Sequence, residues 1–322
     1  MFQREPRYHS LSFRPIMTAM IDLHTHSNAS DGSLSPVSLI REAVRLGISA
    51  IALTDHDSIK GLSFARNEAE SLGIRFIPGI EIEINHPYAG QFHLLGLGIS
   101  RPSPAFIEAV AGLSRLREER NREILERVRR MGLDAGWEDL LLLAQRDSAA
   151  KLGEKSSTKN AGPVPSIGRP HFAALLIKRG IVKNQEQAFE RYLTPGKPLY
   201  VPKAGLDFDE AQALIRESGG LPVLAHPMSL YVSLNRLPAL FEDLKNRGLA
   251  GIEAWHPTAK LRECRRLEEI ARELGLYVSA GSDFHGENRP GRSLGHSCAG
   301  RPIEDSILEA IPELSAPLSG SC

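Results

Sequence analysis

Short apolar segments alternate with longer segments of helical period from residue 20 onward. Short apolar runs indicate buried strands, whereas apolar residues spaced three and four apart indicate helices. This alternation is typical of βα units around a mainly parallel sheet, and seven strands with helices between them favour an α/β barrel over an open sheet. The predicted strands are Met20–His24, Ala50–Thr54, Arg75–Ile84, Gln91–Ile99, Pro222–Ala225, Ala250–Ala254 and Leu276–Ala280.

Four helices stand out between these strands. Pro36 lies near the first turn of the first helix, where its missing N–H leaves no bond unmade. Gly47, Gly73, Gly248 and Gly275 follow the helical segments in the position of C-terminal caps. The predicted helices are Pro36–Leu46, Gly61–Leu72, Arg236–Arg247 and Thr258–Leu274.

The alternation of strands and helices is interrupted in the middle of the chain. Residues 104–218 are almost wholly helical in pattern, which predicts an inserted helical subdomain between two barrel segments, 20–103 and 219–300. Within this insertion, residues 149–166 are rich in Lys, Ser, Gly and Pro and predict a flexible surface loop. The barrel is therefore expected to be built from two separate stretches of sequence.

The two ends of the chain lack a comparable pattern. Residues 1–19 show neither a helical nor a strand period. They carry three arginines among polar residues and lack the apolar stretch of a signal peptide. They are expected to form a disordered leader. Residues 301–322 are expected to form a C-terminal tail.

Composition narrows the class of protein. With 39 basic and 39 acidic residues the chain has no net charge, which argues against a generally cationic nucleic-acid-binding surface. The three cysteines are scattered, which excludes a disulfide scaffold and favours a reducing, cytoplasmic location. No apolar run approaches the roughly 20 residues of a membrane helix, and no obligate protein partner is evident.

Polar side chains cluster where the first predicted strand ends. Asp22, His24 and His26 are spaced two apart, so they point to the same side of an extended chain. Two imidazoles on one side of a strand end can clamp a metal ion. Asp22 is expected to orient one of them from behind, and Asp55, beside His56 after the second strand, is given the same supporting role.

Metal-binding residues recur at the ends of nearly all the other strands. The carboxyl ends of barrel strands meet at one mouth, and a hairpin over residues 85–90 would bring His93 across from Glu81–Glu83. One such histidine could simply be buried and hydrogen-bonded, but six histidines with three carboxylates indicate a metal site. The candidate ligands are His24, His26, Asp31, His56, Glu81, His93, His226, Asp283 and His285.

The size and chemistry of this set limit the metals it suits. Nine ligands exceed what one ion can use, and at three or four protein ligands each they suit two or three ions. Nitrogen and oxygen donors without thiolate point to Mn²⁺, Zn²⁺ or Fe²⁺ rather than Ca²⁺. The sequence does not choose among these three.

Taken together, the motifs resemble the polymerase and histidinol phosphatase (PHP) family of metal-dependent phosphoesterases. The resemblance spans residues 20–300, and within the family it is closest to the stand-alone bacterial branch with a helical insertion, which includes nucleoside 3′,5′-bisphosphate phosphatases and 5′→3′ exoribonucleases. The motifs are HTHSNASDG (24–32), LTDHD (53–57), GIEIE (79–83), HLLG (93–96), AHP (225–227) and SDFH (282–285).

The resemblance implies a distorted (β/α)7, TIM-like barrel that holds three ions, commonly Mn²⁺. It assigns one ion to His24, His26, Glu81 and Asp283. It assigns a second to Asp31, His56 and His285, and a third to Glu81, His93 and His226. Glu81 would then bridge two ions.

Two arginines and a histidine are candidate substrate contacts. Arg169 and His171 open a helix inside the insertion, and the family branch has a similar RPH segment. The planar guanidinium of Arg169 suits a phosphate or carboxylate, although a salt bridge at the helix start is the alternative. Arg292, just after the last ligand motif, is a weaker candidate.

Other residues are expected to lie outside the site. His256, Trp137 and Trp255 are interpreted as loop, core or rim residues, with His256 the first of the remaining histidines to test. The segment 113–131 carries seven Arg and four Glu and is interpreted mainly as a solvated helix face.

The expected function is hydrolysis of nucleotide phosphate esters by a metal-bridging hydroxide. The substrate would be a nucleoside 3′,5′-bisphosphate, converted to the 5′-monophosphate, or short 5′-phosphorylated RNA trimmed from its 5′ end. Histidinol-phosphate hydrolysis is the first alternative. An amidohydrolase commonly has a carboxylated lysine in mid-barrel, where this chain has Glu81 and His93, and a non-catalytic PHP module commonly loses ligands.

Overall fold

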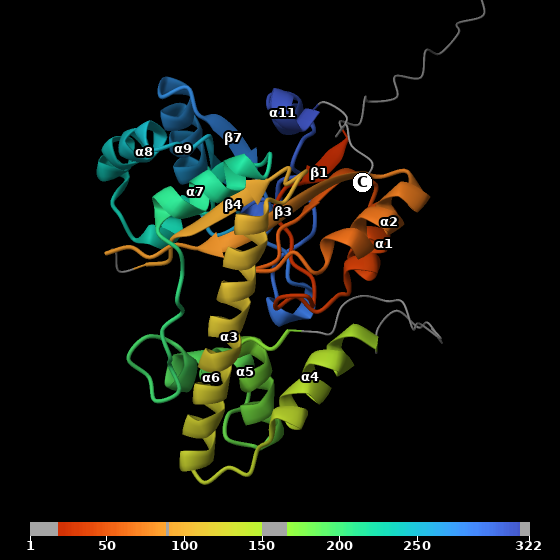
Figure 1. Ribbon diagram of the computed structural model, residues 1–322, viewed down its shortest axis with the longest axis vertical. Helices are drawn as coiled ribbons and strands as arrows, with labels where there is room; N and C mark the ends of the chain where they lie inside the picture. The colour runs from red at the N-terminus through yellow and green to blue at the C-terminus, as the bar shows by residue number, and fades with distance from the viewer. Residues whose placement is uncertain (1–18, 88–89, 150–165, 316–322) are drawn as a thin grey trace, which may run out of the picture.

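Seven strands form one sheet whose spatial order follows the chain from β1 to β7. The computed structural model describes residues 19–87, 90–149 and 166–315 (Figure 1). All seven predicted strands are present, with ends shifted by a few residues. They are β1 Met20–Asp22, β2 Ile48–Leu53, β3 Arg75–Glu83, β4 His93–Leu97, β5 Leu221–Leu224, β6 Gly251–Trp255 and β7 Tyr277–Ala280.

The sheet curls into a nearly closed barrel in which one strand runs against the others. β4 is antiparallel to both β3 and β5, whereas the remaining neighbours are parallel. A short hairpin can only join antiparallel strands, so the direct β3–β4 connection forces this reversal. Beyond the strand ends, a parallel bridge between Thr25 and Phe284 brings the first and last strands together.

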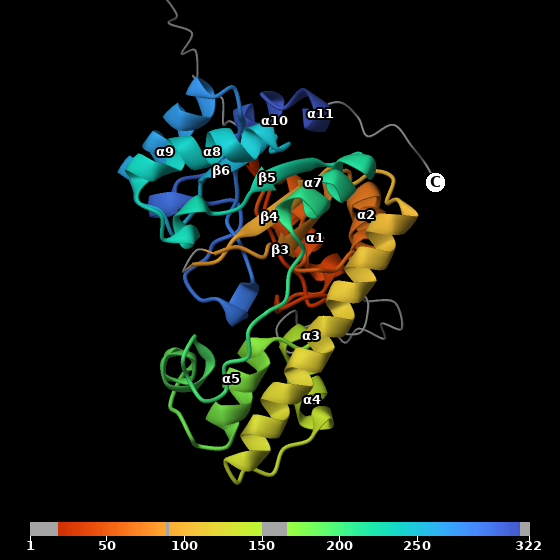
Figure 2. The same ribbon diagram turned by 60° about the vertical axis from the view of Figure 1, so that its left-hand side comes forward.

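Helices cover the outside of the barrel, and the four predicted ones are all present (Figure 2). The first begins where Ser35 caps it by accepting a hydrogen bond from the Ser38 N–H, with Pro36 in its first turn. The covering helices are α1 Pro36–Arg45, α2 Leu62–Leu72, α7 Phe208–Glu217, α8 Leu237–Asn246 and α9 Leu261–Glu273. No helix in the described ranges is both long and apolar enough to cross a membrane.

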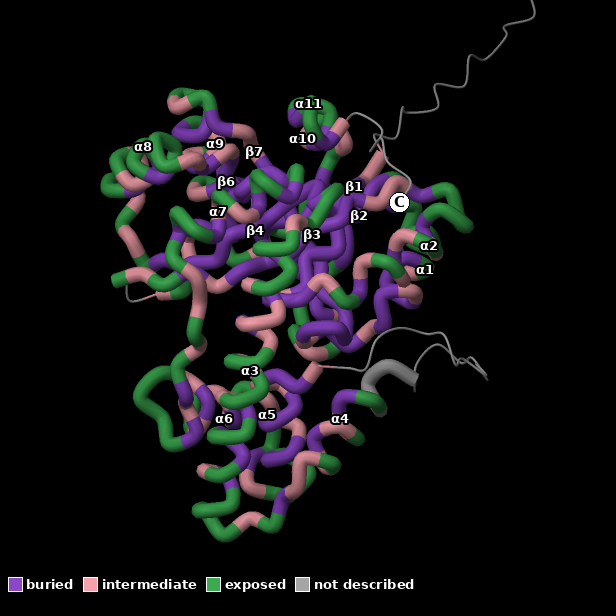
Figure 3. Tube along the Cα trace, viewed as in Figure 1, coloured by how far each residue is buried: buried purple, intermediate pink, exposed green. Residues whose placement is uncertain are grey.

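The inserted helices lie beneath the barrel in Figures 1 and 2 and have a hydrophobic core of their own. That core includes Phe172 and Leu176, and Figure 3 shows buried segments on the inward sides of these helices. The helices are α3 Pro104–Arg130, α4 Trp137–Ala149, α5 Arg169–Lys178 and α6 Gln185–Ala188, and α6 continues into a π-helical turn over Phe189–Leu193.

The insertion is narrower than the predicted range 104–218. Phe106 and Val110, in the first turns of α3, pack into the core between the sheet and its helices, whereas Ile124 and Val128 further along α3 belong to the insertion's core. Phe208 in α7 also packs with the barrel. One helix, α3, therefore joins the two cores.

Part of the predicted C-terminal tail packs against the barrel. Ile303, Ile311 and Leu314 are buried in the core that fills the barrel interior, and two short helices, α10 Ser306–Glu309 and α11 Pro312–Ser315, hold them there. Helices of four residues carry too little pattern to be predicted. The rest of the tail, the leader except Ala19, and the predicted loop except Ala149 and Ser166 lie outside the described residues.

Candidate metal centre

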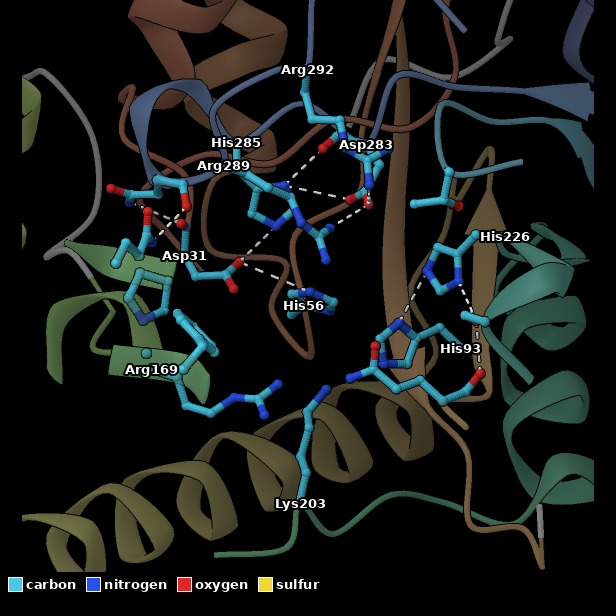
Figure 4. A pocket seen from close by; sticks show the side chains of 18 of the residues that line it. Asp31, His56, His93, Arg169, Lys203, His226, Asp283, His285, Arg289 and Arg292 are labelled. Atoms are coloured by element: carbon cyan, nitrogen blue, oxygen red, sulfur yellow. Dashed lines mark hydrogen bonds and ion pairs between the residues drawn. The ribbon is translucent and has the colours of Figure 1, made fainter. Parts of the chain in front are cut away.

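The structure brings all nine predicted metal ligands together at one end of the barrel. The residues follow the carboxyl ends of the parallel strands, and β4 contributes its first residue because it runs the other way. Figure 4 shows six of them around a cavity. In chain order they are His24, His26, Asp31, His56, Glu81, His93, His226, Asp283 and His285.

Glu81 lies at the middle of the cluster and is fully buried. Its Oε1 is 2.8 Å from His93 Nδ1 and 2.9 Å from His226 Nε2. Its Oε2 lies 2.9–3.4 Å from three more imidazoles. One carboxylate therefore contacts the rings of five histidines, which are His24, His26, His56, His93 and His226.

Two aspartates complete the cluster. Asp31 Oδ1 is 3.3 Å from His285 Nε2 and 3.9 Å from His56 Nε2. Asp283 Oδ1 is 3.4 Å from His26 Nε2 and 3.7 Å from the corresponding atom of His24. Asp283 thus joins the histidines after β1 to the last strand.

Hydrogen bonds outside the cluster orient the rings of His24 and His285. His24 Nδ1 is 2.9 Å from Glu253 Oε1, and His285 Nδ1 is 2.9 Å from the Asp283 carbonyl oxygen. A carbonyl oxygen can only accept a hydrogen bond. The Glu253 carboxyl is ionised, because the neighbouring imidazoles of His24 and His256 lower its pKa by more than burial raises it. Each Nδ1 therefore donates outward, which leaves each Nε2 directed at the cluster as the atom available to a cation.

His226 is oriented by a hydroxyl relay. Ser229 Oγ donates to the Gln91 carbonyl oxygen at 2.9 Å and is 2.7 Å from His226 Nδ1. Because the hydroxyl proton is already used, Ser229 accepts from Nδ1–H. The Nε2 lone pair of His226 then faces Glu81 Oε1 and, at 3.2 Å, His93 Nδ1.

Burial lowers the pKa of His93, but the Glu81 and Glu83 carboxylates raise it to about 9. The buried rings and carboxylates thus pair through protons that a bound cation would replace. Within the described part of the chain, Glu81 Oε2, Asp31 Oδ1, His26 Nδ1 and His56 Nδ1 are buried without a hydrogen bond. The donor set therefore fits metal ions. Three overlapping groups have ligand atoms close enough to share an ion: His26, Asp31, His56 and His285; His24, His26 and Glu81; and His56, Glu81 and His93.

The carboxylates of the cluster are ionised at neutral pH. Burial alone would raise the pKa of Glu81, but the imidazoles of His56 and His93 outweigh burial and hold it well below its ordinary value. Burial likewise raises the pKa of Asp283, and the nearby Arg289 guanidinium and His285 bring it well below the ordinary range. The carboxylates of Glu81 and Asp283 are thus free of protons and available to bind a cation.

Backbone geometry at the strand ends turns the ligands into the mouth. His226 and Asp283 both have positive φ angles, 28° and 51°, which non-glycine residues rarely adopt and which cluster at functional sites. Gly281 precedes Asp283 by two residues, and a Cβ there would lie 2.2 Å from His24 Cβ and 2.6 Å from Glu253 Oε1. Only glycine allows this close approach.

A cavity of about 940 Å³ opens over the cluster, between the barrel mouth and the insertion. Figure 4 shows Arg169 and Lys203 extending into it from the insertion side, facing Asp31 and His56. The basic residues that line the cavity are Arg117, Arg120, Arg169, Lys203, Arg289 and Arg292.

Two of these basic residues lack a counter-ion. Lys203 is 3.1 Å from both Asp57 Oδ2 and Glu83 Oε2, but in the described ranges neither Arg120 nor Arg169 has a carboxylate within 4 Å. Burial and the neighbouring Arg169 together lower the pKa of Arg120 to about 10, so the group stays charged at neutral pH. Two guanidiniums that form no ion pair within the described residues have the chemistry to bind an anion.

Comparisons with known proteins agree with this site. A model of the PHP domain matches residues 22–160. The chain is 36% identical over 279 residues to the 3′,5′-nucleoside bisphosphate phosphatase of Chromobacterium violaceum, an alignment covering 87% of this chain and 92% of that protein. The chain belongs to the PHP domain family. It is also 33% identical over 269 residues to the 5′-3′ exoribonuclease of Haemophilus influenzae, covering 84% and 91%.

Solved structures share the fold of this PHP domain. An amidohydrolase from Chromobacterium violaceum with bound sulfate and no metal matches with a TM-score of 0.74 at 32% identity, over 91% of this chain and 97% of that one. A candidate metal-dependent phosphoesterase from Bifidobacterium adolescentis matches with a TM-score of 0.76 at 26% identity, over 94% and 99%. The predicted distorted (β/α)7 barrel of the PHP type is confirmed.

The predicted substrate contacts have different outcomes. Arg169 and Arg292 line the cavity of the PHP domain. His171 does not: it is 3% exposed, and its Nδ1 accepts a hydrogen bond from the Gly168 N–H at 2.9 Å. The predicted substrate role of His171 is therefore wrong, because its ring caps the start of α5 instead.

The two supporting aspartates hold backbone rather than imidazoles. Asp22 accepts from the N–H groups of His24 and Ser282 at 3.2 and 3.0 Å. Asp55 accepts from Ser27 N at 2.8 Å and from the hydroxyls of Ser27 and Ser30. The prediction that Asp22 orients an imidazole is wrong. Glu253 does so for His24.

Several site residues were missed or misjudged. His256 does lie in the loop after β6, but it was expected outside the site, whereas it is 2% exposed, lines the cavity and has Nε2 3.3 Å from Asp283 Oδ2. Arg117 and Arg120 belong to a helix face expected to be solvated, but both line the cavity. The signal available for His256 was its place directly after a strand. For Glu253 the signal was an acidic residue inside an apolar strand.

Proposed function

We propose that this protein is a metal-dependent phosphoesterase acting on nucleotides. Its substrate is a nucleoside 3′,5′-bisphosphate, which it converts to the 5′-monophosphate, or a short 5′-phosphorylated RNA, which it trims from the 5′ end. The names of the two relatives support both substrates, since each aligns over more than four fifths of this chain.

One observation supports the proposal: the candidate metal ligands and a pair of guanidiniums line the same cavity. The barrel side presents the His, Glu and Asp cluster, and the insertion side presents Arg120 and Arg169 without counter-ions. A substrate with two phosphates can place the one to be cleaved at the cluster and the other at the guanidiniums. Nucleoside bisphosphates and the first two phosphates of a 5′-phosphorylated RNA both have this form.

The same charges disfavour the alternatives. Histidinol phosphate has a single phosphate and a protonated amine, which would be repelled by the guanidiniums of Arg120 and Arg169. Amidohydrolases commonly have a carboxylated lysine among the ligands, whereas Lys203, a lysine lining this cavity, is ion-paired to Asp57 and Glu83. A module without catalysis would not retain the full donor set.

The nine clustered residues would hold two to three divalent ions, with Mn²⁺ preferred and Zn²⁺ or Fe²⁺ as alternatives. When bound, such ions neutralise phosphate charge and make water nucleophilic at neutral pH. The protein's side chains orient the candidate ligands and select the substrate. Glu253 and Ser229 fix the protons of His24 and His226, and Arg169 binds phosphate through its planar fork.

The direct test is phosphate release from adenosine 3′,5′-bisphosphate by the purified protein in Mn²⁺, Zn²⁺ or Fe²⁺. Release of mononucleotides from short 5′-phosphorylated oligoribonucleotides is measured beside it, with histidinol phosphate as comparison. We expect turnover of at least one nucleotide substrate and far weaker turnover of histidinol phosphate. Absence of both nucleotide activities with every metal would refute the proposal.

Replacing Arg169 with alanine is expected to raise KM for adenosine 3′,5′-bisphosphate by about tenfold or more, because hydrogen bonds between charged groups contribute ~1.5–3 kcal/mol. The metal content should be unchanged, since Arg169 contacts none of the candidate ligands within 4 Å in the described chain. Steady-state kinetics and elemental analysis measure both. Arg115→Ala, on the exposed side of α3, is the matched control. Unaltered kinetics in Arg169→Ala would remove Arg169 from the site.

We also propose a cytoplasmic location, which subcellular fractionation would test. Cys264 and Cys298 are buried, free thiols in one small apolar cluster. A reducing compartment preserves neighbouring thiols of this kind.

A further inference from the structure

Tyr231 occupies an unusual position at the rim of the cavity. It directly follows the short 3-10 turn Pro227–Leu230, which itself follows the candidate ligand His226. Its side chain lines the cavity and is 81% exposed, the largest exposed fraction among the big apolar and aromatic side chains of the described ranges. An aromatic ring is normally at least half covered, so this one has an uncovered apolar face.

The backbone holds the ring in this exposed position at a conformational cost. Tyr231 has φ 55° and ψ 30°, in the left-handed region that glycine and asparagine favour and bulky residues rarely occupy. Such outliers persist where the surrounding structure enforces them, and they cluster at ligand-binding sites. A glycine would fit this backbone better, so the ring itself is what the position provides.

The turn that carries Tyr231 is fixed to the metal centre and to the β3–β4 hairpin. Gln91 N donates to Ser229 O at 2.8 Å, and Ser229 Oγ links the Gln91 carbonyl oxygen to His226 Nδ1. Leu230 is 1% exposed and anchors the turn in the core. The exposed ring is therefore held at a set place relative to the cluster, instead of on a free loop.

We propose that Tyr231 is the stacking platform for the base of the substrate nucleotide, which makes it a specificity-determining residue. This rests on the proposed function. Aromatic side chains bind bases through their π-faces, with little preference among the four bases. Phe189 also lines the cavity, but the Arg169 guanidinium already lies 5.9 Å from its ring centroid. In the described chain the Tyr231 ring has no such partner.

The experiment measures equilibrium binding of adenosine 5′-monophosphate and of ribose 5-phosphate, which lacks the base, to the Mn²⁺-loaded protein. Wild type should bind the nucleotide at least about tenfold more tightly than the sugar phosphate, and Tyr231→Ala should remove most of that ratio. Tyr231→Phe should retain the ratio, because it keeps the ring. Ile107→Ala, which removes an exposed apolar side chain outside the cavity, is the control and should behave as wild type.

Tyr231→Gly separates a binding role from a structural one. It relieves the left-handed strain, so its melting temperature should equal or exceed that of wild type while the binding ratio falls as in Tyr231→Ala. An equal affinity of wild type for the two ligands, or an unchanged ratio in both Tyr231→Ala and Tyr231→Gly, would overturn the proposal. The binding assay does not depend on turnover, so failure of nucleotide hydrolysis would count against the proposed function and not against Tyr231.

Discussion

Replacing Glu81 with glutamine is expected to lower the rate of phosphate release by about a thousandfold or more and to release bound metal. Bound metal ions contribute several kcal/mol of transition-state stabilisation, and each 1.4 kcal/mol corresponds to a factor of ten. Glu81 contacts five imidazoles through its two oxygens, so no other side chain can replace it. Glutamine keeps its size and loses its charge and one acceptor.

Turnover and metal stoichiometry in Glu81→Gln are measured together, with circular dichroism to show that the barrel remains folded. Glu70→Gln, on the exposed side of α2, is the matched control and should leave both quantities unchanged. A folded Glu81→Gln protein with full metal content and full activity would show that the cluster is not the site of hydrolysis.

Replacing Glu253 with glutamine is expected to lower metal affinity by about ten- to a hundredfold, the usual effect of losing a partner behind a metal-binding histidine. Glu253 Oε1 accepts from His24 Nδ1, while Oε2 accepts from the His226 N–H at 2.7 Å. Both neighbours donate, so the residue must accept twice. Glutamine can accept only once, and its amide N–H₂ would meet a donor at either His24 or His226.

Equilibrium dialysis of Mn²⁺ against metal-free protein measures this effect without relying on catalysis. Glu269→Gln on α9 has an exposed carboxylate and serves as the control. If folded Glu253→Gln binds Mn²⁺ as tightly as wild type, then Glu253 does not position His24. A loss of thermal stability in the metal-free protein alone would assign Glu253 a purely structural role.

The strands and the meeting of the histidines and carboxylates at one end of the barrel were predictable because most of these residues interrupt an apolar run near a strand end. A histidine or carboxylate at that place has no packing reason, and a barrel brings all the strand ends together. The hairpin before β4 even placed His93 opposite Glu83, as the register shows. Local pattern and closed topology together were sufficient for these residues.

Glu253 was not predictable in the same way. Its partner His24 lies 229 residues away in the sequence, and strand alternation does not tell which neighbour lies beneath an inward carboxylate. His256 did follow a strand, but it lies directly after Trp255 and before Pro257, where a loop interpretation was equally consistent. The local pattern marks Glu253 and His256 as unusual, but their partners depend on the closure of the barrel and are not identified by that pattern.

The arginines of α3 show that the pattern of a helix likewise does not reveal its neighbours in the fold. Helical period identifies which side chains share a face, but it does not reveal what that face meets. Arg120 Nε donates to the Val201 carbonyl oxygen, 81 residues further on, and Arg117 is 2.9 Å from Asp57 in the barrel. A charged face that looks solvated in sequence thus becomes one wall of the cavity.

Helix α3 runs without a break from the barrel core into the insertion's core, so its geometry determines where its side chains lie. Arg117 and Arg120 lie between the turns packed on the barrel and those packed in the insertion, so the helix fixes their height above the metal-binding cluster. One extra residue before them would rotate both side chains by about 100° around the helix axis and raise them by about 1.5 Å. In the proposed substrate complex, the course of α3 therefore sets the distance between the two phosphates.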